Sequence, residues 1–232
     1  SSWPFIQSLR RLLKRKKMKI VSFSKLYLDE LTQEVVPFWE KHSIDSEYGG
    51  FYTCINSDHE VYDTDKFLWL QARQVWTFAT LYDRLEKKKI WFEIAQSGSD
   101  FLEKFGHDGN YNWFFSLQRD GQPLVMPYNI FSYTFACMAM GKMHHITGEK
   151  KYKIVVNETL KKIIQREAKP KDRWDKSYPD TRPLKNFALP MILCNLFNEL
   201  GDLIPRKEKE KHIHACVNDI FNLFWDEKRE VI

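Results

Sequence analysis

Residues 65–85 have the sequence DKFLWLQARQVWTFATLYDRL, and their pattern is the strongest indication of the fold class. Apolar side chains recur in it at helical spacing on two separate stripes. The stripes are Phe67, Leu70, Phe78 and Leu81 on one side and Leu68, Ala72, Val75 and Ala79 on another. A helix that is apolar on nearly every side must be buried on nearly every side. We therefore expect a core helix here, beginning after Asp63 and Thr64.

The same periodicity predicts further helices before and after this stretch. Residues 129–146 and 184–200 are nearly uncharged, which is typical of buried helices. The remaining predicted helices have one apolar and one charged face. They are 23–39, with Ser24 as its N-cap, and 90–105, 149–167 and 206–224. Buried helices thus alternate with half-exposed helices along the chain.

Two predicted β-hairpins separate these helices. Gly50–Ile55 and Glu60–Asp63 flank one turn, and Tyr111–Gln118 and Gln122–Met126 flank the turn at Asp120-Gly121. The hairpins lie about 62 positions apart, and each precedes a buried helix, which is a weak internal repeat. This pattern predicts an all-α fold, an incomplete (α/α)6 toroid of about seven helices with short hairpins at one end. We expect residues 20–232 to form the N-terminal part of a single barrel domain.

The net charge of +5 comes from the N-terminal segment, residues 1–19, which holds seven basic residues and no acidic residue. Without these seven, 29 basic residues face 31 acidic residues, so the body offers no basic surface for nucleic acid. We expect residues 1–19 to be a disordered extension, with a basic amphipathic helix as the alternative.

The rest of the composition excludes several classes of protein. No run of 18 apolar residues is present, so no membrane span is expected. The four cysteines are widely spaced and form no metal-binding or disulfide pattern. Cys137 and Cys194 lie in apolar helical stretches, where a buried reduced thiol is expected. No secretory signal is visible, which favours the cytoplasm.

Short motifs on these predicted elements carry a resemblance to a known family. They are Tyr48-Gly49-Gly50-Phe51-Tyr52, Trp69-Leu70-Gln71-Ala72-Arg73-Gln74-Val75-Trp76, Ile130-Phe131-Ser132, Met138-Ala139-Met140 and Ala188-Leu189-Pro190-Met191. From about Phe23 to the end, the chain resembles the N-acylglucosamine 2-epimerase family, also known as renin-binding protein. The resemblance implies an isomerase with an (α/α)6 barrel. Such an enzyme interconverts N-acetylglucosamine and N-acetylmannosamine by moving the C2 proton of the open-chain sugar.

This reaction requires two kinds of protein group. Removing a proton next to an aldehyde builds negative charge on the carbonyl oxygen, which a fixed donor must stabilise. Two bases on opposite faces of C2 then allow inversion. The resemblance implies that both are histidines in the second half of the barrel, beyond this chain. We expect structural or solvent roles for His42, His59, His107, His144, His145, His212 and His214, and we expect this truncated chain to be inactive alone.

Arg73 is the main candidate for an active-site residue, because it lies in the middle of the apolar stretch between Trp69 and Trp76. A buried arginine needs partners, so it either makes a structural ion pair or ring contact or binds a sugar oxygen. The resemblance implies the second role, as the catalytic stabiliser of the oxyanion. The expected substrate-binding residues are Trp69, Gln71, Tyr52 and Asn186. For Gln71, capping a local network is the alternative.

Asn186 and Pro190 indicate a branch of the superfamily. Aldose isomerases that resemble this chain carry a histidine four residues after the asparagine, where this chain has Pro190. The resemblance to the amino-sugar epimerases, which also have proline there, therefore favours an amino-sugar substrate. Phe131 replaces a tyrosine of those isomerases, and a core role is expected for it.

Two weaker features of the family concern ligands and partners. A segment proposed to bind ATP in the family resembles Gly98-Ser99-Asp100-Phe101-Leu102 of this chain. ATP would act there as an allosteric effector. We expect no required cofactor and no metal. A stretch that resembles a leucine zipper for a homodimer holds three leucines spaced by seven, Leu189, Leu196 and Leu203. With Pro190 and Pro205 in the stretch, such leucines are more often core residues.

Two alternative functions remain open. A truncated chain could be a non-enzymatic module that dimerises or binds a renin-like protease, because an incomplete ring exposes apolar faces. A glycoside hydrolase on the same toroid would need two carboxylates facing a cleft. The acidic residues of this chain lie mostly on predicted outer helices and loops, which disfavours a hydrolase.

Overall fold

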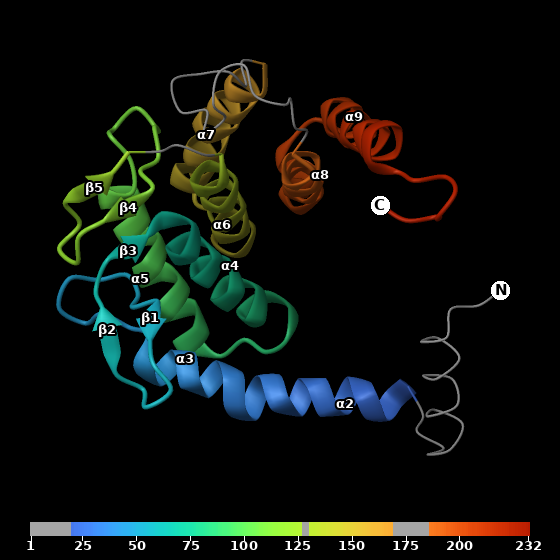
Figure 1. Cartoon of the computed structure of the whole chain (residues 1–232). Coiled ribbons are helices and arrows are strands. Elements are labelled where there is room, and N and C mark those ends of the chain that lie inside the picture. Colours follow the sequence, from blue (N-terminus) through green and yellow to red (C-terminus); the bar gives the residue numbers. More distant parts are fainter. Residues whose placement is uncertain (1–19, 127–129, 169–185) are drawn as a thin grey trace. The chain divides into compact units, whose positions relative to one another are not determined.

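The computed structural model describes residues 20–126, 130–168 and 186–232 (Figure 1). The predicted N-terminal extension, residues 1–19, lies outside the described residues. The chain divides between Ser43 and Ile44 into two compact units.

The described part of the first unit is one helical stretch made of three consecutive segments. They are α2 (Ile20–Glu30), the π-helical turn η1 (Leu31–Val35) and α3 (Val36–His42). The expected helix at 23–39 is confirmed, but Ser24 is not its N-cap, because the helix already includes Ile20. Pro37 has no N–H for the usual hydrogen bond four residues back. The N–H of Val36 bonds the carbonyl of Leu31 instead, which is the spacing of a π-turn.

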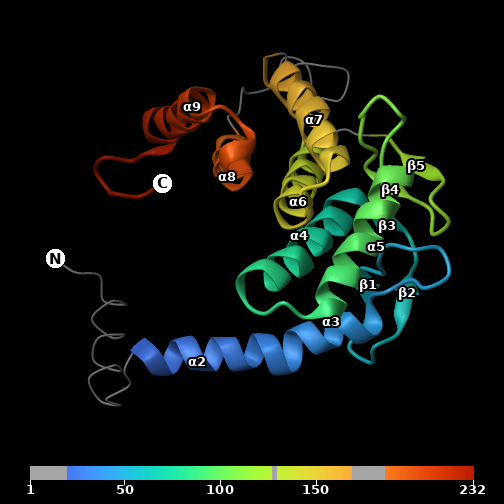
Figure 2. The same ribbon diagram turned by 180° about the vertical axis from the view of Figure 1, so that it is seen from behind.

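The described residues of the second unit form six long helices in pairs. They are α4 (Leu68–Arg84), α5 (Lys89–Phe105), α6 (Phe131–Thr147), α7 (Lys150–Ala168), α8 (Ala188–Leu200) and α9 (Arg206–Phe224). Helices α4 and α8 both pack against α6, and α5, α7 and α9 each pack against the helix that precedes them (Figures 1 and 2). The predicted alternation of inner and outer helices is therefore confirmed for the described residues.

Helix α6 is the most buried of these helices, because α4, α5, α7 and α8 all contact it. This explains why its sequence has almost no charged side chains. Its charged residue Lys142 is 8% exposed and is paired with Asp83 of α4 at 3.2 Å. The helix ends at Gly148, whose positive φ of 71° is the left-handed conformation that favours glycine at a helix end.

In the part of the chain that the structure describes, five short strands form two small sheets. They are β1 (Cys54–Ile55), β2 (Val61–Asp63), β3 (Lys66–Phe67), β4 (Ser116–Leu117) and β5 (Pro123–Val125). Antiparallel pairs β1–β2 and β4–β5 confirm both predicted hairpins, with shorter strands than expected. The turn at Asp120-Gly121 is also confirmed, with Gly121 at φ 95°.

Strand β3 corrects the predicted start of the central helix. Lys66 and Phe67 pair with β4, so α4 begins at Leu68 rather than near Asp65. The N–H of Leu68 donates to the carbonyl of Phe115 at 3.0 Å. Pairing with a hairpin some 50 residues away thus overrides the local helical pattern, which no local periodicity can reveal.

Close packing between α4 and α5 depends on Gly98. A Cβ atom at this position would lie 2.5 Å from the ring of Phe51 and 2.7 Å from Val75. Glycine therefore lets α5 approach α4 with the ring of Phe51 between them, 1% exposed.

The expectation of buried thiols is correct for one of the two cysteines named. Cys137 is fully buried, and burial raises its pKa, whereas Cys194 is half-buried. Within the described residues, no helix has the length and apolar character that a bilayer crossing requires.

Candidate functional site

Arg73 lies on one face of α4 against two aromatic rings. Its guanidinium carbon is 5.8 Å from the ring centre of Trp69 and 5.1 Å from that of Phe135 on α6. The two rings also contact each other, with centres 6.4 Å apart. The expectation that Arg73 is buried is wrong for the described residues: it and Thr77, on the same face, are exposed.

Among the residues that the structure describes, Arg73 has no carboxylate partner that would occupy its donors. No carboxylate of the described ranges lies within ion-pair distance of its guanidinium, although other basic residues of the unit have such partners. Stacking on the rings orients the planar group by cation–π attraction. A guanidinium held in this way presents a rigid set of N–H donors that suits oxygen ligands.

Helix α8 adds polar groups to the same face. The indole N–H of Trp76 donates to Glu199 at 3.2 Å, and the amide nitrogen of Asn195 lies 3.9 Å from the sulfur of Met138 on α6. These contacts bring α4, α6 and α8 together around one surface of aromatic and polar side chains. A few polar groups among aromatic rings are typical of small-molecule sites.

Gln71, predicted as a sugar ligand, has both of its polar groups occupied. Its Oε1 accepts from the N–H of Phe51 at 2.8 Å, and its Nε2 donates to the carbonyl of Phe51 at 2.7 Å. The side chain is buried, and a Cβ on the neighbouring Gly50, which has φ 70°, would lie 2.8 Å from Oε1. The amide therefore caps a local network, which was the alternative interpretation.

The other two predicted ligands lie in different places. Tyr52 is half-buried and precedes β1, and its ring centre is 5.5 Å from the guanidinium of Arg119. Burial and the carboxylate of Asp45 raise the pKa of Tyr52. Exposed Asn186 accepts the N–H of Ala188 at 2.9 Å and so caps the start of α8. The described contacts do not join either residue to Arg73, so Trp69 alone among the predicted ligands touches it.

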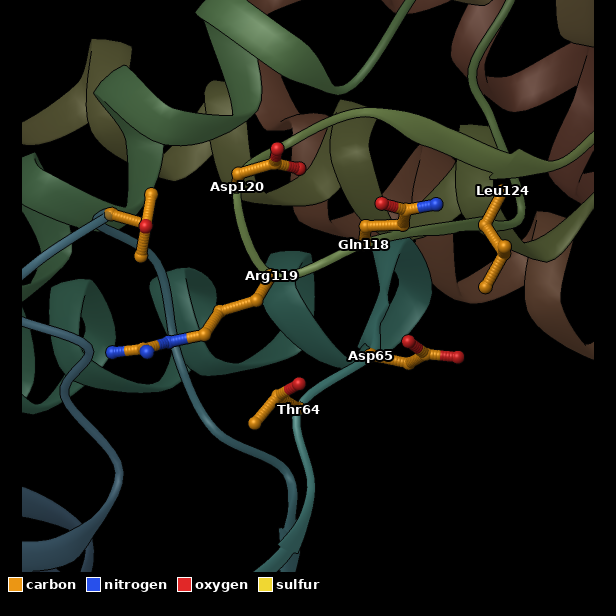
Figure 3. A pocket seen from close by; sticks show the side chains of 7 residues that line it. Thr64, Asp65, Gln118, Arg119, Asp120 and Leu124 are labelled. Atoms are coloured by element: carbon orange, nitrogen blue, oxygen red, sulfur yellow. The ribbon is translucent and has the colours of Figure 1, made fainter.

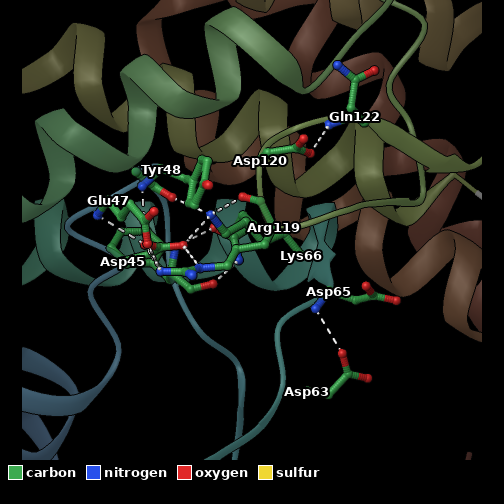
Figure 4. A network of polar contacts seen from close by, with 12 residues as sticks. Asp45, Glu47, Tyr48, Asp63, Asp65, Lys66, Arg119, Asp120 and Gln122 are labelled. Carbon is green, nitrogen blue, oxygen red and sulfur yellow. Dashed lines mark hydrogen bonds and ion pairs between the residues drawn. The ribbon is translucent and has the colours of Figure 1, made fainter.

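A network that the sequence did not predict lies at the N-terminal end of α4. We call it the Lys66 network, consisting of Asp45, Glu47, Lys66 and Arg119 (Figure 4). Lys66 and Asp45 have fully buried side chains and form an ion pair at 3.0 Å. Lys66 also donates to the carbonyls of Gly49 and Arg119. Arg119 binds both oxygens of Asp45 at 3.1 Å and one oxygen of Glu47 at 2.8 Å.

The charges in this network shift one another's pKa values. Burial by itself would raise the pKa of Asp45, but hydrogen bonds from Arg119 and Lys66 outweigh it and hold the pKa well below its usual range. Burial lowers the pKa of Lys66, although Asp45 opposes this change. A lone lysine at the start of an apolar segment is the sequence signal for such a buried pair.

A shallow groove of about 500 Å³ adjoins the Lys66 network (Figure 3). Thr64 and Asp65 line one side of it, and residues of the β4–β5 hairpin line the other. Burial, followed by the charge of Asp63, raises the pKa of Asp65. None of the predicted ligands lines this groove, so the face around Arg73 is the better candidate site.

Four histidines contact aromatic rings, a backbone carbonyl or a carboxylate, and none of these contacts involves Arg73. His107 packs on Tyr111 and Trp113, and His212 stacks on Phe197 with ring centres 4.3 Å apart. His144 contacts the carbonyl of Glu149, and His145 lies 3.5 Å from Asp83. The described residues contain no cluster of three or more histidine, cysteine or acidic side chains that could hold a metal ion.

The segments proposed for ATP and for dimerisation occupy packed positions. In the first, Gly98, Ser99, Phe101 and Leu102 are buried in α5. Of the heptad leucines, Leu196 is fully buried, and Leu203 lies beyond the end of α8 in a 3₁₀ turn. ATP as an effector and a homodimer stay predictions.

Comparison with known proteins places this architecture among sugar epimerases. The family model for N-acylglucosamine 2-epimerase (GlcNAc 2-epimerase) matches residues 50–198. The N-acylglucosamine 2-epimerase of Bos taurus is 36% identical over 174 residues, which cover 72% of this chain and 41% of that protein. That of Homo sapiens is 36% identical over 176 residues, covering 72% and 40%. A solved sugar epimerase from a ruminal bacterium matches with a TM-score of 0.74 at 19% identity, covering 86% of this chain and 55% of the other.

These matches confirm the predicted fold class, a partial (α/α)6 barrel, and the described residues form mainly helices with two small sheets. More than half of the chain lies within the family match. The chain belongs to the N-acylglucosamine 2-epimerase family. It spans less than half the length of the bovine and human relatives.

Proposed function

We propose that this chain supplies the Arg73 side of the active site in an enzyme that interconverts N-acetylglucosamine and N-acetylmannosamine. The observation that carries the proposal is the guanidinium of Arg73, held over Trp69 and Phe135 on an exposed face. Membership of the family and the proline at position 190 support an amino sugar as the substrate.

Arg73 would act on the oxygen that gains charge in the reaction. Loss of the C2 proton from the open-chain sugar moves electrons onto the C1 carbonyl oxygen. The N–H groups of Arg73 then donate to this oxygen and stabilise the enolate, and they release it when C2 regains a proton on the opposite face. The ring of Trp69 would contact the apolar surface of the sugar and exclude water.

The bases that move the proton would come from residues beyond this chain. His107 packs on two rings, His144 contacts a carbonyl, and His145 lies beside Asp83. None of these contacts links a histidine to Arg73. The proposed division of roles therefore gives this chain the oxyanion donor and assigns the general bases to the remaining part of the barrel.

Proton exchange at C2 tests the proposal. N-acetylmannosamine is incubated in deuterium oxide with the protein extended to the full barrel, and NMR follows the loss of the C2 proton. We expect exchange in this protein and a loss of roughly 10²–10³ in rate for Arg73→Ala, the scale of one oxyanion donor. A folded Arg73→Ala variant with the original rate would overturn the assignment of Arg73.

A further inference from the structure

The Lys66 network lies where α4, the helix that carries Arg73, begins. This helix has no side chain that caps its N-terminus; Phe67 at the N-cap position is extended. Instead, β3 pairs with β4, and the first N–H of α4 donates to Phe115. Tertiary contacts therefore replace the local cap in fixing where α4 starts.

Two buried attachments hold this first part of α4. Just before the helix, Lys66 is tied to Asp45, to the carbonyl of Gly49 and to the carbonyl of Arg119. One turn into the helix, Gln71 is tied to both backbone groups of Phe51. All of these partners belong to the loop that follows Ser43 or to the β4–β5 hairpin.

Gln71, the attachment within the helix, and Arg73 lie on opposite sides of α4. Gln71 and Arg73 are two residues apart, which is a rotation of about 200° at 3.6 residues per turn. Gln71 is 1% exposed, whereas Arg73 is exposed. A slip of α4 by one residue would rotate Arg73 by about 100° around the helix axis and shift it by about 1.5 Å along that axis.

We propose that Asp45, Lys66 and Gln71 are positioning residues that set the rotation and height of α4 and thereby the place of the Arg73 guanidinium. The importance of this positioning for turnover rests on the proposed function. The position of Arg73 itself can be measured without a substrate. Errors of about 1 Å in such groups cost about 10²-fold in rate. The network thus acts on Arg73 through the helix.

The far end of α4 offers a matched control. Asp83 forms an ion pair with Lys142 of α6 at 3.2 Å, with side chains 19% and 8% exposed. This pair joins the same helix to the core, but it lies ten residues beyond Arg73. Breaking it should lower stability without rotating the first turns of α4.

The side-chain Nε–H resonance of Arg73 is the readout, measured by NMR on the ¹⁵N-labelled chain of residues 1–232. The rings of Trp69 and Phe135 shift this resonance, and Arg73→Lys identifies it by removing it. The variants are Lys66→Met, Gln71→Met and the milder Arg119→Gln, whose arginine side chain is 34% exposed. Lys142→Met is the control, and urea unfolding measures the stability of each variant.

We expect the network variants, by which we mean Lys66→Met, Arg119→Gln and also Gln71→Met, to move the Arg73 resonance toward the position of a free arginine. We expect Lys142→Met to leave the resonance in place at a comparable loss of stability. If Lys66→Met does not fold, Gln71→Met and Arg119→Gln decide the comparison. An unchanged resonance in folded network variants would overturn the proposal. If Arg73→Ala of the full barrel keeps its exchange rate, the proposed function fails, while the resonances still decide the positioning.

Discussion

Trp76 donates its indole N–H to the carboxylate of Glu199 at 3.2 Å, across 123 residues of sequence. This bond joins α4 to α8, two helices that both pack on α6. It lies one turn along α4 from Arg73. A hydrogen bond to a charged acceptor therefore helps to hold the first and third inner helices around the candidate site.

Removing this bond should lower stability in a graded way. We expect Glu199→Ala to reduce the free energy of unfolding by about 1.5–3 kcal/mol, the range for hydrogen bonds to charged groups. Glu199→Gln keeps an acceptor and should lose less. Urea unfolding measures both, with exposed Glu227→Ala as the control. Equal stability of Glu199→Ala and the original chain would show that the bond contributes nothing.

Arg73→Lys should be almost as harmful as Arg73→Ala in the full barrel. An ammonium keeps the charge but cannot reproduce the planar donor fork or its stacking on Trp69 and Phe135. The measurement is the rate of C2 exchange, with circular dichroism as the check on folding. A lysine variant with near-normal turnover would mean that charge alone matters.

Residues 1–232 alone should show no measurable C2 exchange. In the proposed division of roles this chain supplies only the oxyanion donor, and the lack of each general base would remove a factor of typically 10²–10⁴. The comparison is between this chain and the extended protein at equal concentration in deuterium oxide. Exchange at equal rates would place the bases within these residues, with His107 and His145 as the first candidates to replace.

Acid should weaken the fold through Asp45. Its pKa is lowered in the folded state by Arg119 and Lys66, so its contribution is complete above the unfolded value of about 3.9 and declines as the pH falls below it. We expect the free energy of unfolding to drop below about pH 4, and less steeply in Arg119→Gln. Parallel pH profiles for the two proteins would contradict this role of Arg119.

Gly98→Ala should destabilise the second unit. The added methyl group would overlap the ring of Phe51 and the side chain of Val75, and overpacking of this kind costs about 1–3 kcal/mol. Ser97→Ala, an exposed position on the same helix, is the control and should not destabilise. The midpoint of thermal unfolding reports the difference; a midpoint for Gly98→Ala at or above that of Ser97→Ala would rule out the clash.

The helices could be predicted from the sequence because burial leaves a periodic trace. The stretches at 90–105 and 206–224 agree with α5 and α9 within a residue at each end. Strand β3 was missed, because Phe67 continues the apolar pattern of α4 and the pairing partners of the strand lie near residue 116. Local spacing carries no information about such distant partners.

The candidate site was less predictable than the fold. Trp69 and Arg73 share a helix face, so their proximity follows from spacing alone, but Phe135 on α6 could be found only from the packing of two helices. Gln71 lies in the same motif yet points to Phe51, since two residues along a helix reverse the direction of a side chain. The exposure of Arg73 depends on which helices cover α4, and the sequence does not state this.

The buried lysine at position 66 also has a consequence for the folding pathway. Its three partners lie 17, 21 and 53 residues away, so its bonds form only after several loops have closed. We expect these late contacts to be unformed in the folding transition state. Loss of the lysine should then accelerate unfolding with little effect on the folding rate. The buried charge would govern how long a folded molecule lasts rather than how quickly it forms.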